Sequence, residues 1–186
     1  MKVEMSSQVV RRPSNQLWIY FHGSIDAHDS PGFVRLEEHG VNVIYLIMSL
    51  RWIAGARRVC RRIQGDIECL RTYPDTIVWA GNSWGAEQMH RYAVYAQQHG
   101  FADLIGPHCL VHYAGRFRGH VAKDVPCLCY LGEKGMVLDE PIQAMVRGTE
   151  ETAAAYGTKV IRLPGAHRWN AECNERILND VQEVLA

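Results

Sequence analysis

The residues best suited to chemistry surround a serine, Ser83, in the sequence GNSWG (81–85). An apolar run, TIVWAG (76–81), leads into this sequence, and a helix-like pattern follows directly. A serine at such a junction lies in a sharp turn, and the two glycines remove side chains where helix and neighbouring strand come close. The turn exposes the hydroxyl beside helix N–H groups that can stabilise an oxyanion. The pattern indicates a nucleophilic serine; an ordinary turn containing a serine is the alternative.

A second candidate is a histidine near the end of the chain. A serine hydroxyl is a poor nucleophile at neutral pH and needs a base with a pKa near 7 within hydrogen-bond reach. Among nine histidines, His167 follows the last expected strand and precedes the closing helix. His90 and His112 instead fall within an expected helix and an expected strand. His167 is therefore the predicted base, and a histidine that only packs its loop is the alternative.

The sequence FHGSID (21–26) follows the first clear apolar run and predicts a backbone turn. Its N–H groups would face Ser83 from the neighbouring strand. We expect the N–H of Ser24 to be one oxyanion donor and the N–H of Trp84 to be the other. For the His22 side chain we favour a structural hydrogen bond to the loop.

Strand-like and helix-like segments alternate along the whole chain and would position these residues. This alternation predicts an α/β fold: a doubly wound, mostly parallel sheet of about six strands with helices on both faces. Functional groups then gather at the carboxyl ends of the strands. We expect one domain, 1–186, with strands at 16–23, 41–50, 76–81, 108–115, 125–132 and 158–165, and helices at 30–40, 54–72, 84–99, 140–157 and 171–185.

Composition argues against several classes of function. Twenty basic and twenty acidic residues cancel, which gives no electrostatic case for binding nucleic acid or an anionic membrane. No apolar run approaches the roughly 20 residues of a membrane span, and the first residues contain no apolar signal core. The six cysteines have neither CxxC nor zinc-finger spacing. We therefore expect reduced thiols and a cytoplasmic protein without a metal site.

From about Gln16 to its end, the chain resembles a small, lidless α/β-hydrolase of the serine esterase or dienelactone hydrolase type. The resemblance depends on FHG (21–23), GNSWG (81–85) and GAH (165–167). It implies Ser83 as nucleophile, His167 as base, and Ser24 and Trp84 as donors of the oxyanion hole, with nucleophile, acid and base in that chain order. The short linker RFRGHVAKD (116–124) leaves no room for a cap domain.

The acid of the triad departs from the family's pattern. Gly-x-x-Asp is frequent after the penultimate strand, whereas this chain has glycine at Gly135, where the aspartate is expected. We favour Asp139, in a slightly longer loop, and Glu133 is the alternative acid; a third possibility is that no acid is used. Asp139 is equally well placed to cap the following helix.

Two tryptophans and an arginine lie beside the predicted site. Trp84 and Trp169 would either form the walls of an acyl or aryl pocket or simply pack their loops. Arg168 would either bind an anionic group of the substrate or form a surface ion pair. The sequence contains neither a glycine-rich phosphate loop nor clustered metal ligands, so no cofactor is predicted.

These observations favour a serine hydrolase acting on a small-molecule acyl ester or thioester through an acyl-enzyme on Ser83. The same groups would also serve amide hydrolysis. One alternative is a catalytically impaired α/β-hydrolase-like protein that binds a partner, its acid lost at Gly135. Another is a flavodoxin-like binder, although FHGSIDAHDSPG (21–32) is a poor phosphate-binding turn.

Overall fold

The structure is a computed structural model that describes residues 6–22, 34–47, 55–70, 72–117, 122, 124–132, 140–163, 169 and 171–186. Its strands are β1 (Ser6–Val10), β2 (Gln16–Phe21), β3 (Asn42–Ile47), β4 (Thr76–Asn82), β5 (Cys109–Tyr113), β6 (Cys127–Gly132) and β7 (Val160–Leu163). Its α-helices are α1 (Ala56–Glu68), α2 (Trp84–Gln98), α3 (Ala102–Ile105), α4 (Glu140–Ala155) and α5 (Asn174–Leu185). The 3₁₀ helices among the described residues are η2 (Leu36–His39) and η5 (Ala171–Cys173).

The seven strands in the described parts of the chain form one sheet in the order β1-β3-β2-β4-β5-β6-β7. The six strands from β2 to β7 run parallel, as the alternation of strands and helices predicts. β1 is an additional edge strand that the sequence analysis did not predict, and it pairs with β3 in antiparallel register. β4, which leads to Ser83, is the central strand and lies between β2 and β5.

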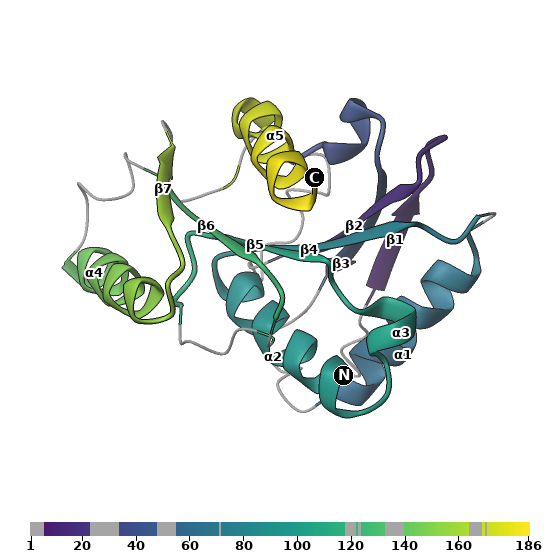
Figure 1. Cartoon of the computed structure of the whole chain (residues 1–186), viewed down its shortest axis with the longest axis horizontal. Helices are drawn as coiled ribbons and strands as arrows, with labels where there is room; N and C mark the ends of the chain where they lie inside the picture. Colours follow the sequence, from purple (N-terminus) through teal and green to yellow (C-terminus); the bar gives the residue numbers. More distant parts are fainter. Residues whose placement is uncertain are drawn as a thin grey trace.

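Helices cover both faces of the sheet, as Figure 1 shows, with α5 on one face and α1, α2 and α3 on the other. The central strands are apolar on both sides, which is typical of a parallel sheet buried between two helical layers. Alternate residues of β2 accordingly enter different cores: Trp18 and Tyr20 pack with α5, whereas Ile19 and Phe21 pack with α1 and α2. The doubly wound α/β architecture predicted from the sequence is confirmed.

The strand registers align the carboxyl ends of the parallel strands along one edge of the sheet. Phe21, the last residue of β2, pairs with Gly81, and Tyr113, the last residue of β5, pairs with Asn82. On the other side, Gly132 at the end of β6 pairs with Leu163 at the end of β7.

In the part of the chain that the structure describes, no helix is both long and apolar enough to cross a membrane.

Candidate active site

Ser83 forms a single-residue turn between β4 and α2 at the carboxyl edge of the sheet. Its backbone has φ 53° and ψ −125°, in the positive-φ region that favours glycine. The Ser83 N–H donates to the carbonyl of Tyr113 at 2.8 Å, and the Ser83 carbonyl accepts from the N–H of Ala86 at 3.1 Å. A non-glycine residue in such a conformation costs about 1–3 kcal/mol and persists only where its surroundings enforce it.

Three glycines leave the space that this turn requires. A Cβ on Gly81 would lie 2.6 Å from the Cα of Ala86, and one on Gly85 would lie 2.2 Å from the carbonyl oxygen of Phe21. A Cβ on Gly115, which follows β5, would lie 2.3 Å from the carbonyl oxygen of Ser83 itself. All these contacts are with backbone atoms, which cannot rotate away as a flexible side chain can. The spacing of the glycines in GNSWG therefore has a steric cause.

The Ser83 side chain is half-buried and makes no capping hydrogen bond to α2, a helix that lies wholly within the described residues. Serine is a preferred N-cap residue where the backbone is in the β region, and the positive φ of Ser83 departs from that geometry. The first N–H groups of a helix have no intrahelical acceptor, and the helix dipole makes them favourable for negative charge. The N–H of Trp84 is in that first turn, immediately after the serine.

Two buried histidines support the turn from the α2 side of the sheet. His112 Nε2 lies 2.9 Å from the carbonyl oxygen of Gly115, so this nitrogen carries the proton. His112 Nδ1 must then accept a hydrogen bond from His90 Nε2, 3.1 Å away. Burial lowers the pKa of His112 from 6.5 to about 4, and the Gly115 carbonyl opposes this shift by stabilising the ring N–H. His112 is therefore neutral at pH 7.

The carbonyl of Gly115 also connects the turn at Ser83 to α4. The hydroxyl of Thr149 donates to the Gly115 oxygen at 3.1 Å and accepts from the N–H of Phe117 at 3.3 Å. Gly115 thus receives hydrogen bonds from β5 and α4 while it packs against the Ser83 carbonyl. The sequence pattern did not predict this arrangement. Its only sequence signal is a small-residue pair, Ala114-Gly115, at the end of the strand after Ser83.

Trp169, Trp84 and His22, which the sequence places beside the predicted site, pack against the core to different degrees. Trp169 is 0% exposed, edge-on to Tyr20 and stacked on Tyr113, so it packs the core and forms no pocket wall. Trp84 is half-buried against the core beneath α1 and α2. The His22 ring lies edge-on to Tyr20 at 6.2 Å between centroids. The backbone N–H of His22 donates to the carbonyl of Leu46 at 3.1 Å.

Several residues of the sequence prediction lie outside the described residues, namely Ser24, Glu133, Gly135, Asp139, His167 and Arg168. Their roles stay predictions. The described strands that lead to them are β2, which ends at Phe21, β6, which ends at Gly132, and β7, which ends at Leu163. All three end on the sheet edge that holds Ser83. Within the described part of the chain, no three His, Cys, Asp or Glu side chains lie close enough to hold a metal ion.

The chain matches no family model and no curated protein in sequence. It is, however, similar to solved structures. An esterase from Pyrococcus furiosus is 11% identical, with a TM-score of 0.67 over 98% of this chain and 86% of that one. Carboxyl esterase 2 from the fungus Tuber melanosporum is 12% identical, with a TM-score of 0.67 over 98% and 82%.

A dienelactone hydrolase from Anabaena variabilis is also similar, at 14% identity and a TM-score of 0.55 over 97% of this chain and 90% of that one. At such low identities the similarity shows the fold. It shows that fold over nearly the whole length of this chain.

Proposed function

We propose that this chain, which has the α/β-hydrolase fold, is a serine hydrolase that cleaves a carboxylic ester or thioester through an acyl-enzyme on Ser83. The turn at Ser83 is the observation that carries the proposal. The residue is in a costly conformation, three glycines make room for it, and its hydroxyl makes no capping bond to α2. A strained serine beside the first N–H groups of a helix is the arrangement expected of a nucleophile, and this supports the proposal.

In the first half-reaction, the Ser83 hydroxyl oxygen attacks the carbonyl carbon of the substrate and His167 takes its proton. The N–H groups of Trp84 and Ser24 receive the developing oxyanion. The tetrahedral intermediate then collapses, the bond to the alcohol or thiol breaks, and that leaving group takes the proton from His167. An acyl ester on Ser83 remains.

In the second half-reaction, His167 takes a proton from water, and the resulting hydroxide attacks the acyl carbon. Collapse of the second intermediate returns the proton to the Ser83 oxygen and releases a carboxylic acid. An acidic side chain that orients His167 would stabilise the imidazolium in both steps. We assign this role to Asp139, directly before α4, with Glu133, directly after β6, as the alternative.

Burst kinetics with p-nitrophenyl acetate test this function. An acyl-enzyme that hydrolyses slowly gives a rapid release of p-nitrophenol, about one per protein, before the steady state. Ser83→Ala and His167→Ala should abolish the burst while leaving the protein folded by circular dichroism. A folded native protein that hydrolyses neither this ester nor an acyl thioester would contradict the proposal and favour a binding protein on the same fold.

The acid can be assigned in the same assay. Loss of the acid from a serine triad lowers turnover by on the order of 10⁴. Asp139→Asn should cause a loss of that size, whereas Glu133→Gln should have little effect. The reverse result would assign Glu133, and full activity in both variants would show that neither carboxylate orients the base.

A further inference from the structure

The carbonyl oxygen of Gly115, just after β5, accepts hydrogen bonds from two buried side chains. The hydroxyl of Thr149 in α4 lies 3.1 Å from this oxygen, and Nε2 of His112 in β5 lies 2.9 Å from it. Both donor side chains belong to residues that are 0% exposed. A carbonyl oxygen has two lone pairs, so the two bonds use its full capacity as an acceptor. The position of Gly115 is therefore set from α4 as well as from the sheet.

Thr149 also binds the chain two residues beyond Gly115. Its hydroxyl oxygen accepts a hydrogen bond from the backbone N–H of Phe117 at 3.3 Å. One hydroxyl thus ties both ends of the segment 115–117 to α4. The ring of Phe117 is buried and lies edge-on to His112, with 5.3 Å between centroids. Movement of this segment away from α4 would therefore disturb a packed ring as well as two hydrogen bonds.

The chain leaves the sheet at Ala114 in a conformation that residues other than glycine rarely adopt. The N–H of Ala114 still donates to the carbonyl of Tyr130 in β6 at 2.9 Å, but the φ of Ala114 is 51°. A positive φ at alanine costs free energy and persists only where the surroundings enforce it. The two hydrogen bonds to the Gly115 carbonyl provide such a constraint one residue later. The turn after β5 therefore has the same kind of strain as the turn at Ser83, against which it packs.

Gly115 lies directly against the carbonyl of Ser83. A Cβ on Gly115 would come within 2.3 Å of the Ser83 oxygen and within 3.0 Å of the Cβ of Ala86, in the first turn of α2. The Ser83 oxygen also accepts a hydrogen bond from the N–H of Ala86 at 3.1 Å. This oxygen is thus held between the first turn of α2 and the backbone of Gly115.

The Ser83 carbonyl belongs to the same peptide unit as the N–H of Trp84. A peptide unit is planar, so the directions of its C=O and N–H groups are fixed relative to each other. Contacts that hold the Ser83 oxygen therefore also hold the direction of the Trp84 N–H, which is one proposed donor of the oxyanion hole. The path from Thr149 through the Gly115 carbonyl to this peptide consists of contacts between described residues at every step.

We propose that Thr149 is a positioning residue, which acts through the Gly115 carbonyl to hold the Ser83–Trp84 peptide with its N–H directed at the developing oxyanion. The inference rests on the proposed function and concerns the part of the site that stabilises charge. Thr149 acts on the backbone of the segment 115–117 rather than on the substrate. Removal of one oxyanion-hole donor costs about 100- to 1,000-fold in kcat, so a donor that is only misaligned should cost about 10-fold.

Two substitutions of Thr149 separate its hydroxyl from its shape. Thr149→Val removes the hydroxyl and keeps the branched side chain, whereas Thr149→Ser keeps the hydroxyl. Thr152→Val is the matched control, because Thr152 lies in the next turn of α4 and its hydroxyl donates to the Gly148 carbonyl within the helix at 2.7 Å. Every protein is first shown to be folded by circular dichroism. Where Thr149→Val does not fold, Thr149→Ala replaces it, since alanine removes the hydroxyl without placing a methyl group against the Gly115 oxygen.

The measurements are the rate at which a fluorophosphonate labels Ser83, and kcat/KM for p-nitrophenyl acetate and for its thionoester, in which sulfur replaces the carbonyl oxygen. Sulfur is a weak hydrogen-bond acceptor, so the thionoester gains little from the oxyanion donors. We expect Thr149→Val to lower the labelling rate and kcat/KM for the oxygen ester by about 10-fold. The ratio of kcat/KM for the oxygen ester to that for the thionoester should fall by a similar factor. Thr149→Ser and Thr152→Val should keep the native ratio.

A folded protein without the Thr149 hydroxyl but with the native ratio overturns the role of Thr149, whatever happens to its stability in urea. An equal fall in Thr152→Val, or no recovery in Thr149→Ser, also overturns that role, because the effect would then come from α4 as a whole or from the methyl group. A native protein that is neither labelled nor able to hydrolyse the ester overturns the proposed function, and the role of Thr149 with it. A labelled native protein with equally reactive variants overturns the role of Thr149 alone.

Discussion

The backbone N–H of Ser83 donates to the carbonyl of Tyr113, the last residue of the neighbouring strand, at 2.8 Å. This bond continues the pairing of β4 and β5 by one residue beyond the last register pair, Asn82 with Tyr113. The chain then turns into α2 with no intervening loop. Ser83 is thus held by the sheet on its N–H side and by α2 on its carbonyl side.

Replacing Ser83 with glycine should stabilise the protein and abolish its activity. Glycine adopts positive φ without the side-chain penalty of about 1–3 kcal/mol, although it loses about 0.5–1 kcal/mol through backbone entropy. Ser83→Ala keeps the penalty, so Ser83→Gly should be more stable than Ser83→Ala by about 1 kcal/mol. Urea unfolding of the two variants measures this difference. Equal stabilities would show that the turn is not strained.

Replacing Gly115 with alanine should destabilise the protein and slow the labelling of Ser83. The new Cβ would lie 2.3 Å from the Ser83 carbonyl oxygen, so the turn must shift. Overpacking of this kind costs about 1–3 kcal/mol. Gly65→Ala in α1 is the matched control, because its Cβ would meet nothing within 4 Å; it should stabilise the helix by about 1 kcal/mol. Native-like stability and labelling of Gly115→Ala would contradict the packing described for this turn.

Acidification should destabilise the protein through His112. Between pH 6.5 and about 4 the unfolded chain binds a proton at this ring that the folded protein excludes, so the free energy of unfolding falls as the pH falls through this window. At about 1.4 kcal/mol per pKa unit, the loss reaches roughly 3 kcal/mol near pH 4. Urea unfolding at several pH values should show a shallower dependence for His112→Gln. If the free energy of unfolding depends on pH in the same way in the native protein and in His112→Gln, His112 is not the cause.

Removing the hydroxyl of Tyr130 should lower stability without affecting the site. Tyr130 of β6 donates to the buried carboxylate of Asp180 in α5 at 2.9 Å, and burial raises the pKa of the phenol. A hydrogen bond to a charged group contributes about 1.5–3 kcal/mol. Tyr130→Phe should lose a stability of that size, as measured by urea unfolding, but label at the native rate. Slower labelling would mean that loosening of α5 disturbs the site.

The sequence was sufficient to predict most of the fold, because the parallel strands are continuous apolar runs that end at glycines or polar residues. β1 was not predicted, since SSQVV (6–10) is an edge strand that is only partly buried and lacks such a run. Several elements were predicted to be longer than the described residues show: β7 begins at Val160, after the expected 158, and α1 ends at Glu68, before the expected 72. α3 is a single turn and left no periodic pattern.

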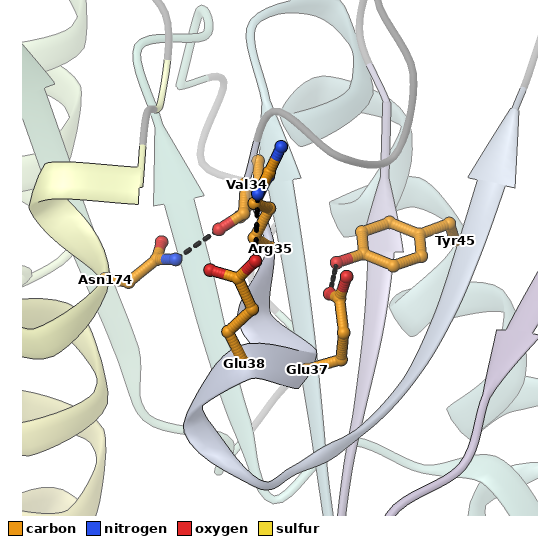
Figure 2. A network of polar contacts seen from close by, with 6 residues as sticks. All are labelled: Val34, Arg35, Glu37, Glu38, Tyr45 and Asn174. Carbon is orange, nitrogen blue, oxygen red and sulfur yellow. Dashed lines mark hydrogen bonds and ion pairs between the residues drawn. The ribbon is translucent and has the colours of Figure 1, made fainter.

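The turn at Ser83 was predicted because its constraint is local: the glycines that clear it are two residues away on either side. Gly115 was missed because its constraint is a contact with Ser83, from a different loop. The hydrogen bond from the Asn174 amide to the Val34 carbonyl, drawn in Figure 2, was missed for the same reason, since it spans 140 residues. Pairings of this kind depend on the folded chain and leave no periodic trace in the sequence.

The most direct test of the account is the intact mass of the protein after treatment with a fluorophosphonate, beside Ser83→Ala. The account predicts one adduct on the native protein and none on the variant, because only an activated serine reacts and Ser83 is the one that the turn presents. A folded native protein without an adduct, or a Ser83→Ala protein labelled as fully as the native one, would contradict it.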